Sequence, residues 1–296
     1  MNRRKFTITG SASALAAMSG LAFADIKTPA GFKPLFNGKN LDGWHPVPRL
    51  PMKKFYQTDI FRKDYEAYKI RSQHLGKWEV KDGGISGGQN PAGSRLGSYL
   101  VTNRMYADFE LLVDAKPDWP ADTGIMLRSA PGRGNLGYQV LVDHRPKGSI
   151  GGFFGNGIGS YRIWPFEIDL DKDENGNIKG LKAVKASEEK TANLSYACSS
   201  EEFLKTWKFN DWNTFRIRCV GSTLPKLTVW INGVKISELD TSKISWEGYR
   251  PDYVAKLIGP MGHIGFEVHD NDPKMDWDRW GKGSVCRWKN IFIKEL

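Results

Sequence analysis

The sequence contains few cysteines, and their spacing forms no metal or redox motif. The 296 residues include only Cys198, Cys219 and Cys286. An odd number of thiols cannot pair completely, and three do not make the disulfide framework of a small secreted scaffold. No Cys-x-x-Cys spacing occurs, which argues against a cysteine zinc site. Whether two of the three form a disulfide stays open.

The sequence also lacks a long hydrophobic run after its first 24 residues, and it lacks a basic cluster. The formal charge is +10, and removing Arg3, Arg4 and Lys5 leaves +7 (10 − 3). The remaining lysines and arginines are scattered, without a recognition helix or a basic arm, so we expect no nucleic-acid partner. Without an apolar stretch of about 20 residues, we also expect no stable membrane insertion.

The first 24 residues predict an export signal. Residues 3–6 read Arg-Arg-Lys-Phe, and residues 8–23 form a short, weakly apolar run. Residues 22–24 read Ala-Phe-Ala, which fits a small-x-small cleavage site. Paired arginines are typical of a twin-arginine signal, while an ordinary secretory signal and a retained anchor are the alternatives. We therefore expect residues 1–24 to be removed and the protein to be periplasmic or extracellular.

Short alternating strands between turn signals dominate the rest of the chain. The predicted strands span residues 78–80, 108–115, 124–129, 138–142, 213–220, 227–231, 264–269 and 288–293. Asn232-Gly233 predicts a tight hairpin turn, because both residues accept the positive φ that such a turn needs. Many antiparallel strands with few helices predict an all-β fold, either a β-sandwich or a jelly roll.

Two segments depart from the strand pattern. Residues 53–72 are charged and aromatic and predict a helix or an inserted loop. Residues 161–211 form a long insertion, in which Ser199 and Glu202 make a capping box that predicts a short helix. Without internal repeats or a low-complexity linker, residues 25–296 are expected to form one domain with decorated loops.

The strand at residues 264–269 carries two different faces. Its apolar side chains at 264, 266 and 268 alternate with Gly265, Glu267 and His269. Successive side chains of a strand point to opposite faces, so the carboxylate and the imidazole share the face away from the core. A solvated outer face would explain this pattern, and so would the floor of a cleft.

Two further predicted strands repeat this division into an apolar face and a polar face. Gln139 and Asp143 share one face of the strand at 138–142, and Arg128 shares a face with Gly124 and Met126. If the apolar faces meet between two sheets, the polar faces would line one concave surface. We therefore expect Glu267, His269, Arg128 and Asp143 to converge there.

Several motifs, taken in order, resemble the 3-keto-disaccharide hydrolase family, which was formerly catalogued as a domain of unknown function. They are Phe-Asn-Gly-Lys-Asn-Leu-Asp-Gly-Trp at 36–44, Trp-Glu-Val-Lys-Asp-Gly at 78–83, Thr-Gly-Ile-Met-Leu-Arg at 123–128, Gly-Tyr-Gln-Val at 137–140, Gly-His-Ile-Gly at 262–265 and Trp-Lys-Asn-Ile-Phe-Ile-Lys at 288–294. The resemblance covers residues 36–296. It implies a concanavalin-A-like jelly roll with a concave face, in an exported protein that acts on 3-keto-glycosides.

A 3-keto sugar suggests roles for the candidate residues. The ketone acidifies the C2 proton, so a base can remove it, and the glycosidic oxygen then leaves by β-elimination before water adds back. Glu267 and His269 would act as base and acid, and Arg128 would stabilise the enolate. No cofactor is required, although a divalent metal held by His269, Glu267 and Asp143 could replace or assist Arg128.

Two other functions remain open at this stage. A lectin-like jelly roll would bind carbohydrate without cleaving it, and on either reading Gln139, Trp44 and Trp277 are candidates to contact the sugar. The run Glu-Ile-Asp-Leu-Asp at residues 167–171 is similar to the catalytic strand of laminarinase-type glycosidases, in which two carboxylates flank the scissile bond. Its last position holds Asp171, which is one methylene shorter than the glutamate of that motif.

A calcium loop is the one candidate metal site with a recognisable spacing. Asp171, Asp173 and Asn175 occupy alternate positions before Gly176, as in the first half of an EF-hand loop. Lys182 stands where the closing bidentate glutamate should be. A simple hairpin turn at residues 175–176 is the alternative.

Overall fold

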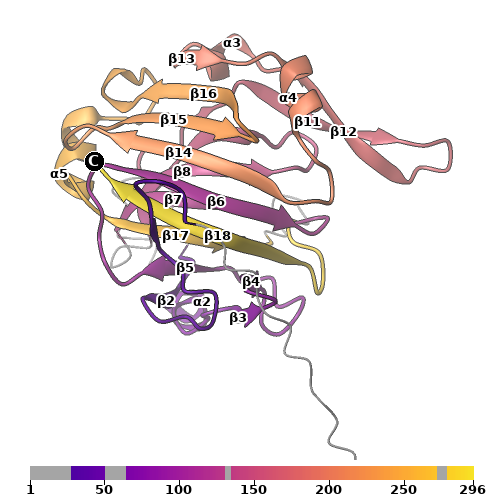
Figure 1. The fold of residues 1–296 in the computed structure, drawn as a ribbon, viewed down its shortest axis with the longest axis horizontal. Helices are drawn as coiled ribbons and strands as arrows, with labels where there is room; N and C mark the ends of the chain where they lie inside the picture. The colour runs from indigo at the N-terminus through magenta and orange to yellow at the C-terminus, as the bar shows by residue number, and fades with distance from the viewer. Residues whose placement is uncertain (1–27, 51–64, 131–134, 272–278) are drawn as a thin grey trace, which may run out of the picture.

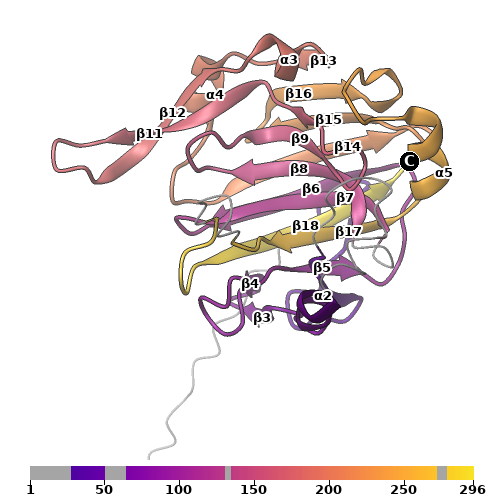
Figure 2. The same ribbon diagram turned by 180° about the vertical axis from the view of Figure 1, so that it is seen from behind.

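The computed structural model describes residues 28–50, 65–130, 135–271 and 279–296. Two antiparallel sheets that pack face to face form the body of the fold. Figure 1 looks onto the larger sheet, and Figure 2 looks onto the smaller sheet from the opposite side. The architecture is an all-β jelly-roll sandwich, as the alternating strands predict.

The larger sheet has nine strands in the order β13-β16-β15-β14-β6-β18-β4-β3, with β1 also paired to β18. Its strands are β1 (Lys33–Pro34), β3 (Lys77–Lys81), β4 (Gly84–Gly88), β6 (Phe109–Pro117), β13 (Leu194–Ala197), β14 (Asn213–Val220), β15 (Lys226–Ile231), β16 (Val234–Asp240) and β18 (Val285–Glu295). Asn232 and Gly233 join β15 to β16 with φ of 48° and 89°, which confirms the predicted hairpin.

The smaller sheet has seven strands in the order β10-β9-β8-β7-β17-β5-β2. They are β2 (Trp44–Pro48), β5 (Ser98–Thr102), β7 (Asp122–Ala130), β8 (Leu136–Asp143), β9 (Ile150–Asn156), β10 (Arg162–Ile163) and β17 (His263–Val268). In β17, Ile264, Phe266 and Val268 are fully buried in the main hydrophobic core. Glu267 therefore belongs to the other face of this sheet, as the alternation predicts.

The insertion at 161–211 completes the edges of both sheets. It supplies β10 to the smaller sheet and β13 to the larger one. Between them, β11 (Phe166–Lys172) and β12 (Ile178–Lys185) form a hairpin that projects from the sandwich (Figures 1 and 2). The predicted cap is present in α4 (Ser200–Thr206), where the Ser199 side chain accepts a hydrogen bond from the Glu202 amide.

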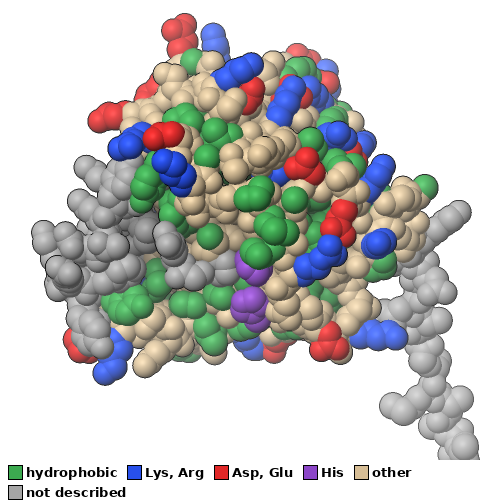
Figure 3. All heavy atoms as spheres, turned by 90° about the vertical axis from the view of Figure 1, so that its left-hand side faces the viewer, with side chains coloured by type: hydrophobic (Ala, Val, Ile, Leu, Met, Phe, Trp, Pro, Cys, Tyr) green, Lys and Arg blue, Asp and Glu red, His purple; other side chains and the backbone are tan. Residues whose placement is uncertain are grey.

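The remaining helical elements of the described residues are short. They are α2 (Tyr65–Ser72), α3 (Glu188–Thr191), η2 (Thr241–Lys243) and α5 (Pro251–Ile258). The helix predicted within residues 53–72 is thus present from Tyr65 onward. Among the described residues, no helix has the length and hydropathy needed to cross a membrane. Acidic and basic side chains are interspersed on the face that Figure 3 shows, in keeping with the scattered charges of the sequence.

An aromatic stack links the two sheets. Trp44 of β2 stacks on Phe266 of β17 with ring centroids 5.4 Å apart, and Phe266 stacks on Trp288 of β18 at 4.8 Å. Trp44 is only 5% exposed, and its indole nitrogen donates to the Leu35 carbonyl. The prediction that Trp44 contacts a sugar is therefore wrong, because its ring is part of the core.

Removing the first ring of this stack should destabilise the whole sandwich. Trp44→Ala is expected to lower the free energy of unfolding by about 3–5 kcal/mol, the usual cost of deleting a buried tryptophan side chain. Urea denaturation followed by circular dichroism would measure this loss. Trp230→Ala is the matched control, because the half-buried Trp230 ring packs under the Arg216 guanidinium outside the core. Equal losses in the two variants would contradict the role of the stack.

Candidate functional site

The carboxylate of Glu267 lies at the centre of a buried polar network. It accepts hydrogen bonds from Arg49 Nε at 2.8 Å, from the Tyr99 hydroxyl at 3.1 Å and from the Gln139 amide nitrogen. Glu267 is 1% exposed and Gln139 is 3% exposed. The structure thus brings these two predicted residues together and makes Gln139 a direct partner of the carboxylate.

Arg49 connects Glu267 to two other groups. Its Nε binds Glu267, its Nη1 binds Asp270, and its Nη2 lies 2.9 Å from His269 Nε2. Burial alone would lower the pKa of Arg49, but the nearby Asp270, Tyr99 and Glu267 raise it well above the ordinary value. The guanidinium therefore keeps its charge while each of its three nitrogens holds a different partner.

His269 has a defined tautomer in this arrangement. Its Nδ1 lies 2.6 Å from the Asp270 carbonyl oxygen, which can only accept a hydrogen bond, so Nδ1 carries the proton. Arg49 is a pure donor, so Nε2 presents its lone pair. A carboxylate oxygen of Asp122 is 3.7 Å from the same nitrogen. His269 can therefore accept a proton at Nε2 with a negative charge beside it.

The backbone around this histidine is also held in place. The Thr123 hydroxyl donates to the Glu267 carbonyl at 2.6 Å, and the Gln89 amide donates to the His269 carbonyl at 3.0 Å. Arg71 of α2 binds the second oxygen of Asp270 at 2.8 Å. These contacts come from β7, from the segment after β4 and from α2, so several elements determine where the imidazole lies.

Asp122 and Asp143 form a carboxylate pair next to His269. They are register partners on β7 and β8, and Arg145 binds Asp122 at 3.1 Å and Asp143 at 2.8 Å. Arg279 binds Asp122 at 2.5 Å, and it is placed there by a backbone hydrogen bond from Asp122 to the Arg279 carbonyl. We call Arg49, Glu267, His269, Asp270, Asp122, Asp143, Arg145 and Arg279 the Arg49 cluster.

The two carboxyl groups differ in proton affinity. Burial raises the pKa of Asp122, but His269, Arg145 and Arg279 outweigh it and lower the value to about 2. Burial and the Asp122 charge raise the pKa of Asp143 to about 6, against the effect of Arg145. One member of the pair is thus an anion throughout the physiological range, and the other retains a proton up to near-neutral pH.

Arg128 does not join this cluster, although the sequence predicts that it does. A register shift and a φ of 46° at Arg128 interrupt the alternation of β7. The buried guanidinium instead donates to the carbonyl oxygens of Ala107, Ser222 and Gly221 and to the Asp108 carboxylate. Arg128 therefore ties loops together at the far end of β7, roughly 20 Å along the strand from Asp122, and the prediction that it stabilises an enolate is wrong.

The predicted calcium loop is a hairpin turn between β11 and β12. Asp173 accepts hydrogen bonds from the backbone amides of Asn175 and Asn177, and Asp171 pairs with Lys179 and Lys182. Within the described part of the chain, no three acidic, histidine or cysteine side chains gather as metal ligands would. Asp171 and Asp173 are thus already paired within the hairpin. Metal binding at Asp171, Asp173 and Asn175, or at Glu267, His269 and Asp143, stays a prediction.

The laminarinase-like run lies on the same projecting hairpin. Residues 167–171 belong to β11, which pairs only with β12. Glu167 forms an ion pair with Lys190. No sheet of the sandwich carries these carboxylates, so they do not line its concave face. The remaining sugar-contact candidate, Trp277, lies outside the described residues.

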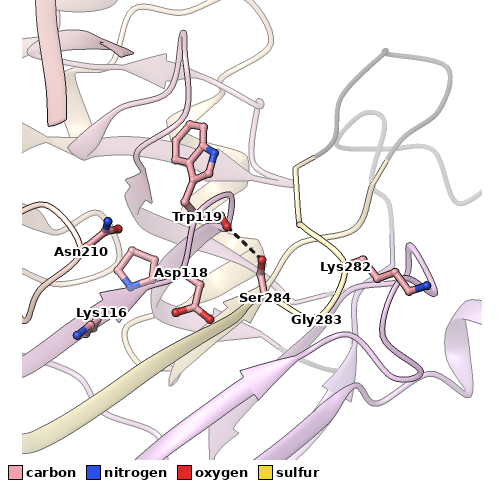
Figure 4. A pocket seen from close by; sticks show the side chains of 8 residues that line it. Lys116, Asp118, Trp119, Asn210, Lys282, Gly283 and Ser284 are labelled. Atoms are coloured by element: carbon pink, nitrogen blue, oxygen red, sulfur yellow. Dashed lines mark hydrogen bonds between the residues drawn. The ribbon is translucent and has the colours of Figure 1, made fainter. Parts of the chain in front are cut away.

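A separate pocket of about 460 Å³ opens beside the turn between β6 and β7. Its lining includes Lys116, Asp118, Trp119, Asn210 and Lys282. Figure 4 shows the hydrogen bond from Ser284 to the Trp119 carbonyl that closes one side of it. None of its lining residues belongs to the Arg49 cluster, and Asp118 is already paired with Arg287. This pocket is therefore separate from the Arg49 cluster.

Sequence reasoning missed most of the cationic part of the cluster. Arg49 follows β2, and Arg145 and Arg279 lie in loops, so no strand alternation indicates where they point. The position of Asp122 could have been predicted from the sequence, because this residue alternates with Gly124 and Met126 on the polar face of β7. Asp270 could be seen only as one of several acidic residues after His269.

The sequence profile of the 3-keto-alpha-glucoside-1,2-lyase-like domain matches residues 31–294. The chain belongs to this family. The match confirms the resemblance that the ordered motifs indicate, and it supports a carbohydrate-active function. No curated protein matches the sequence.

Solved structures with a similar backbone fold have low sequence identity to this protein. A structure from Parabacteroides distasonis, provisionally named a glycosyl hydrolase, has 17% identity over 90% of this chain and 94% of that one, with a TM-score of 0.48. The β-glucanase of Bacillus licheniformis has 10% identity over 90% and 99%, at 0.42. The carbohydrate-binding module CBM66 of Bacillus subtilis has 12% identity over 74% and 92%, at 0.39. Likenesses this distant carry no argument about the reaction.

The unusual proton affinity of Asp143 should appear in the pH dependence of stability. Folding raises the pKa of Asp143 from an ordinary 3.8 to about 6. The proton on Asp143 therefore stabilises the folded state fully at pH values below the pKa of the unfolded chain, and this stabilisation is lost as the pH rises through about 6. Asparagine has no such proton. The melting temperature of Asp143→Asn minus that of the unmodified protein should therefore increase by several degrees between pH 4 and pH 7. A difference that stays constant or falls over this range would contradict the assignment.

Proposed function

We propose that the protein cleaves 3-keto-glycosides by β-elimination followed by hydration, with net hydrolysis of the glycosidic bond. The family supports a carbohydrate substrate of this kind, and the Arg49 cluster supplies the groups that the chemistry needs. A base must remove the C2 proton, a cation must stabilise the enolate oxygen, and an acid must protonate the leaving oxygen.

His269 is the proposed base, and this contact carries the proposal. Its Nε2 lone pair lies 2.9 Å from the Arg49 guanidinium, so a base and a cation are neighbours at one point. When Nε2 accepts the C2 proton, the imidazolium gains Asp122 as a counter-ion at 3.7 Å. Because Arg49 occupies the lone pair in this structure, the substrate ketone has to draw the guanidinium toward its own oxygen before the proton moves.

Arg49 and Arg279 are the proposed enolate-stabilising groups. Negative charge moves from C2 to the ketone oxygen as the proton leaves, and a guanidinium held in a buried site interacts with that charge strongly. Arg279 Nη1 lies 3.5 Å from His269 Nε2, so both cations adjoin the base. Glu267 transfers no proton in this scheme. Tyr99 and Gln139 hold its carboxylate, which anchors Arg49 at Nε while the Nη2 that faces His269 turns toward the ketone oxygen.

Asp143 is the proposed acid. Paired carboxyl groups whose pKa values are pushed apart divide the acid and base roles between them. With a pKa of about 6, Asp143 still holds a proton where Asp122 does not. Loss of the protonated glycosidic oxygen leaves an enone, and water then adds to C1 while a proton returns to C2. The sugar is released as a 3-keto hexose.

Variants of His269 and Glu267 test this assignment. With a 3-keto-α-glucoside as the substrate, His269→Ala should lower kcat by roughly 10²–10⁴-fold, the usual contribution of a positioned base. Glu267→Gln should also lower kcat, because its amide cannot balance the Arg49 charge. The matching unoxidised glucoside should be a poor substrate, since its C2 proton is not acidic. Ultraviolet absorbance of the enone and chromatography of the released sugar would follow the reaction.

His74→Ala and Glu247→Gln are matched controls for these two variants. Glu247 is exposed, and neither residue belongs to the Arg49 cluster. Both controls should turn over the substrate like the unmodified protein. Cleavage of both sugars at equal rates would favour a conventional glycosidase. Carbohydrate binding without turnover of either sugar would favour the lectin-like alternative.

We also propose that the protein acts outside the cytoplasm, on the basis of residues 1–24, which lie outside the described part of the chain. The paired arginines, the short apolar run and the Ala-Phe-Ala sequence support this proposal. Mass spectrometry of the protein isolated from the extracytoplasmic fraction should give an N-terminus near Asp25. A chain that retains Met1–Ala24 in the cytoplasm would contradict it.

A further inference from the structure

A pair of imidazoles lies on the same sheet face as Glu267. His263 begins β17, and alternation places it on the Glu267 face, roughly 13 Å away along the strand. His45 of β2 reaches this face because it is the register partner of Val101, which in turn pairs with Gly265. The two imidazole centroids are 6.3 Å apart with their planes at 89°. Figure 3 shows histidine side chains at the molecular surface.

Oxygen atoms at the end of β5 hold each ring through its own Nδ1 atom. His263 Nδ1 lies 2.6 Å from the Thr102 carbonyl oxygen, and His45 Nδ1 lies 2.6 Å from the Asn103 side-chain oxygen. Both oxygens only accept hydrogen bonds, so each Nδ1 carries the proton and each Nε2 keeps its lone pair. An oxygen acceptor on the remote nitrogen is the arrangement that orients metal-binding histidines and strengthens their donor atom.

We propose that His45 and His263 form a binding site for a divalent transition metal, with Cu²⁺ preferred over Ni²⁺ and Zn²⁺. Neutral imidazole is a ligand for all three ions, and intrinsic affinity is highest for Cu²⁺. Both side chains are only partly buried, so an ion can reach them from solvent.

This site is separate from the Arg49 cluster in its residues and in its chemistry. Two histidines leave the other coordination positions to water or to an added ligand, which agrees with the absence of a three-residue metal group among the described residues. The proposal does not rest on the proposed cleavage reaction. Metal binding and turnover can therefore each be present when the other fails.

Titration of the untagged, metal-free full chain with CuSO₄ tests the proposal. Calorimetry should show one equivalent of Cu²⁺ bound, with weaker binding of NiCl₂ and ZnCl₂. Electron paramagnetic resonance should show nitrogen coupling from two imidazoles. His45→Ala and His263→Ala should each weaken Cu²⁺ binding at least tenfold, and Asn103→Ala should weaken it by about 10–100-fold through loss of the oriented His45 ring.

His74→Ala is the control, because this histidine is not in the pair and its replacement should leave Cu²⁺ affinity unchanged. Circular dichroism of each variant establishes that the fold is retained. The proposal is overturned if the His45→Ala/His263→Ala double variant binds Cu²⁺ as tightly as the unmodified chain. It is overturned equally if the unmodified chain binds none of the three ions. It is also overturned if His74→Ala weakens binding as much as the single variants of the pair.

Discussion

The site depends on the three-way binding of the Arg49 guanidinium. A buried carboxylate such as Glu267 is unfavourable unless a charge and several hydrogen-bond donors compensate for lost hydration, and Arg49, Tyr99 and Gln139 supply these. The same guanidinium neutralises Asp270, whose pKa lies well below its ordinary value despite burial. Arg49 also points toward the lone pair of His269, so one cation contacts both acids and the imidazole.

A glycine on the polar face of the smaller sheet leaves room for this network. Gly124 of β7 lies beneath Gln139, and a Cβ at that position would stand 2.1 Å from the amide nitrogen that binds Glu267. Any larger residue would displace the amide and leave part of the carboxylate without a donor. The opposite face of the sheet packs the aromatic stack through Phe266, so the residue next to Glu267 anchors its strand in the core. Rigid packing on one face thus positions polar groups on the other.

Strand alternation predicts the part of the site that lies on regular strands. It places Glu267 and Gln139 on the face away from the core, and the structure agrees. It fails for Arg128, because a local register shift with positive φ turns that side chain toward the loop carbonyls at Gly221 and Ser222. It is silent on Arg49 and Arg279, since both lie outside strands and approach the cluster through tertiary contacts. Trp44 illustrates a different limit, because an aromatic residue suits a sugar platform and a core equally well, and only packing decides between them.

The central claim is that the Arg49 cluster removes the C2 proton of a 3-keto-glycoside, and isotope exchange tests it most directly. The reaction would be run in D₂O, and the released 3-keto sugar would be analysed by mass spectrometry and proton magnetic resonance. The analysis has to be complete before the hydrogen at C2 exchanges slowly with the solvent without the enzyme. Elimination followed by hydration predicts one deuterium at C2 in every turnover. A product that retains its original hydrogen at C2 would show that the glycosidic bond is displaced directly, and it would contradict this account.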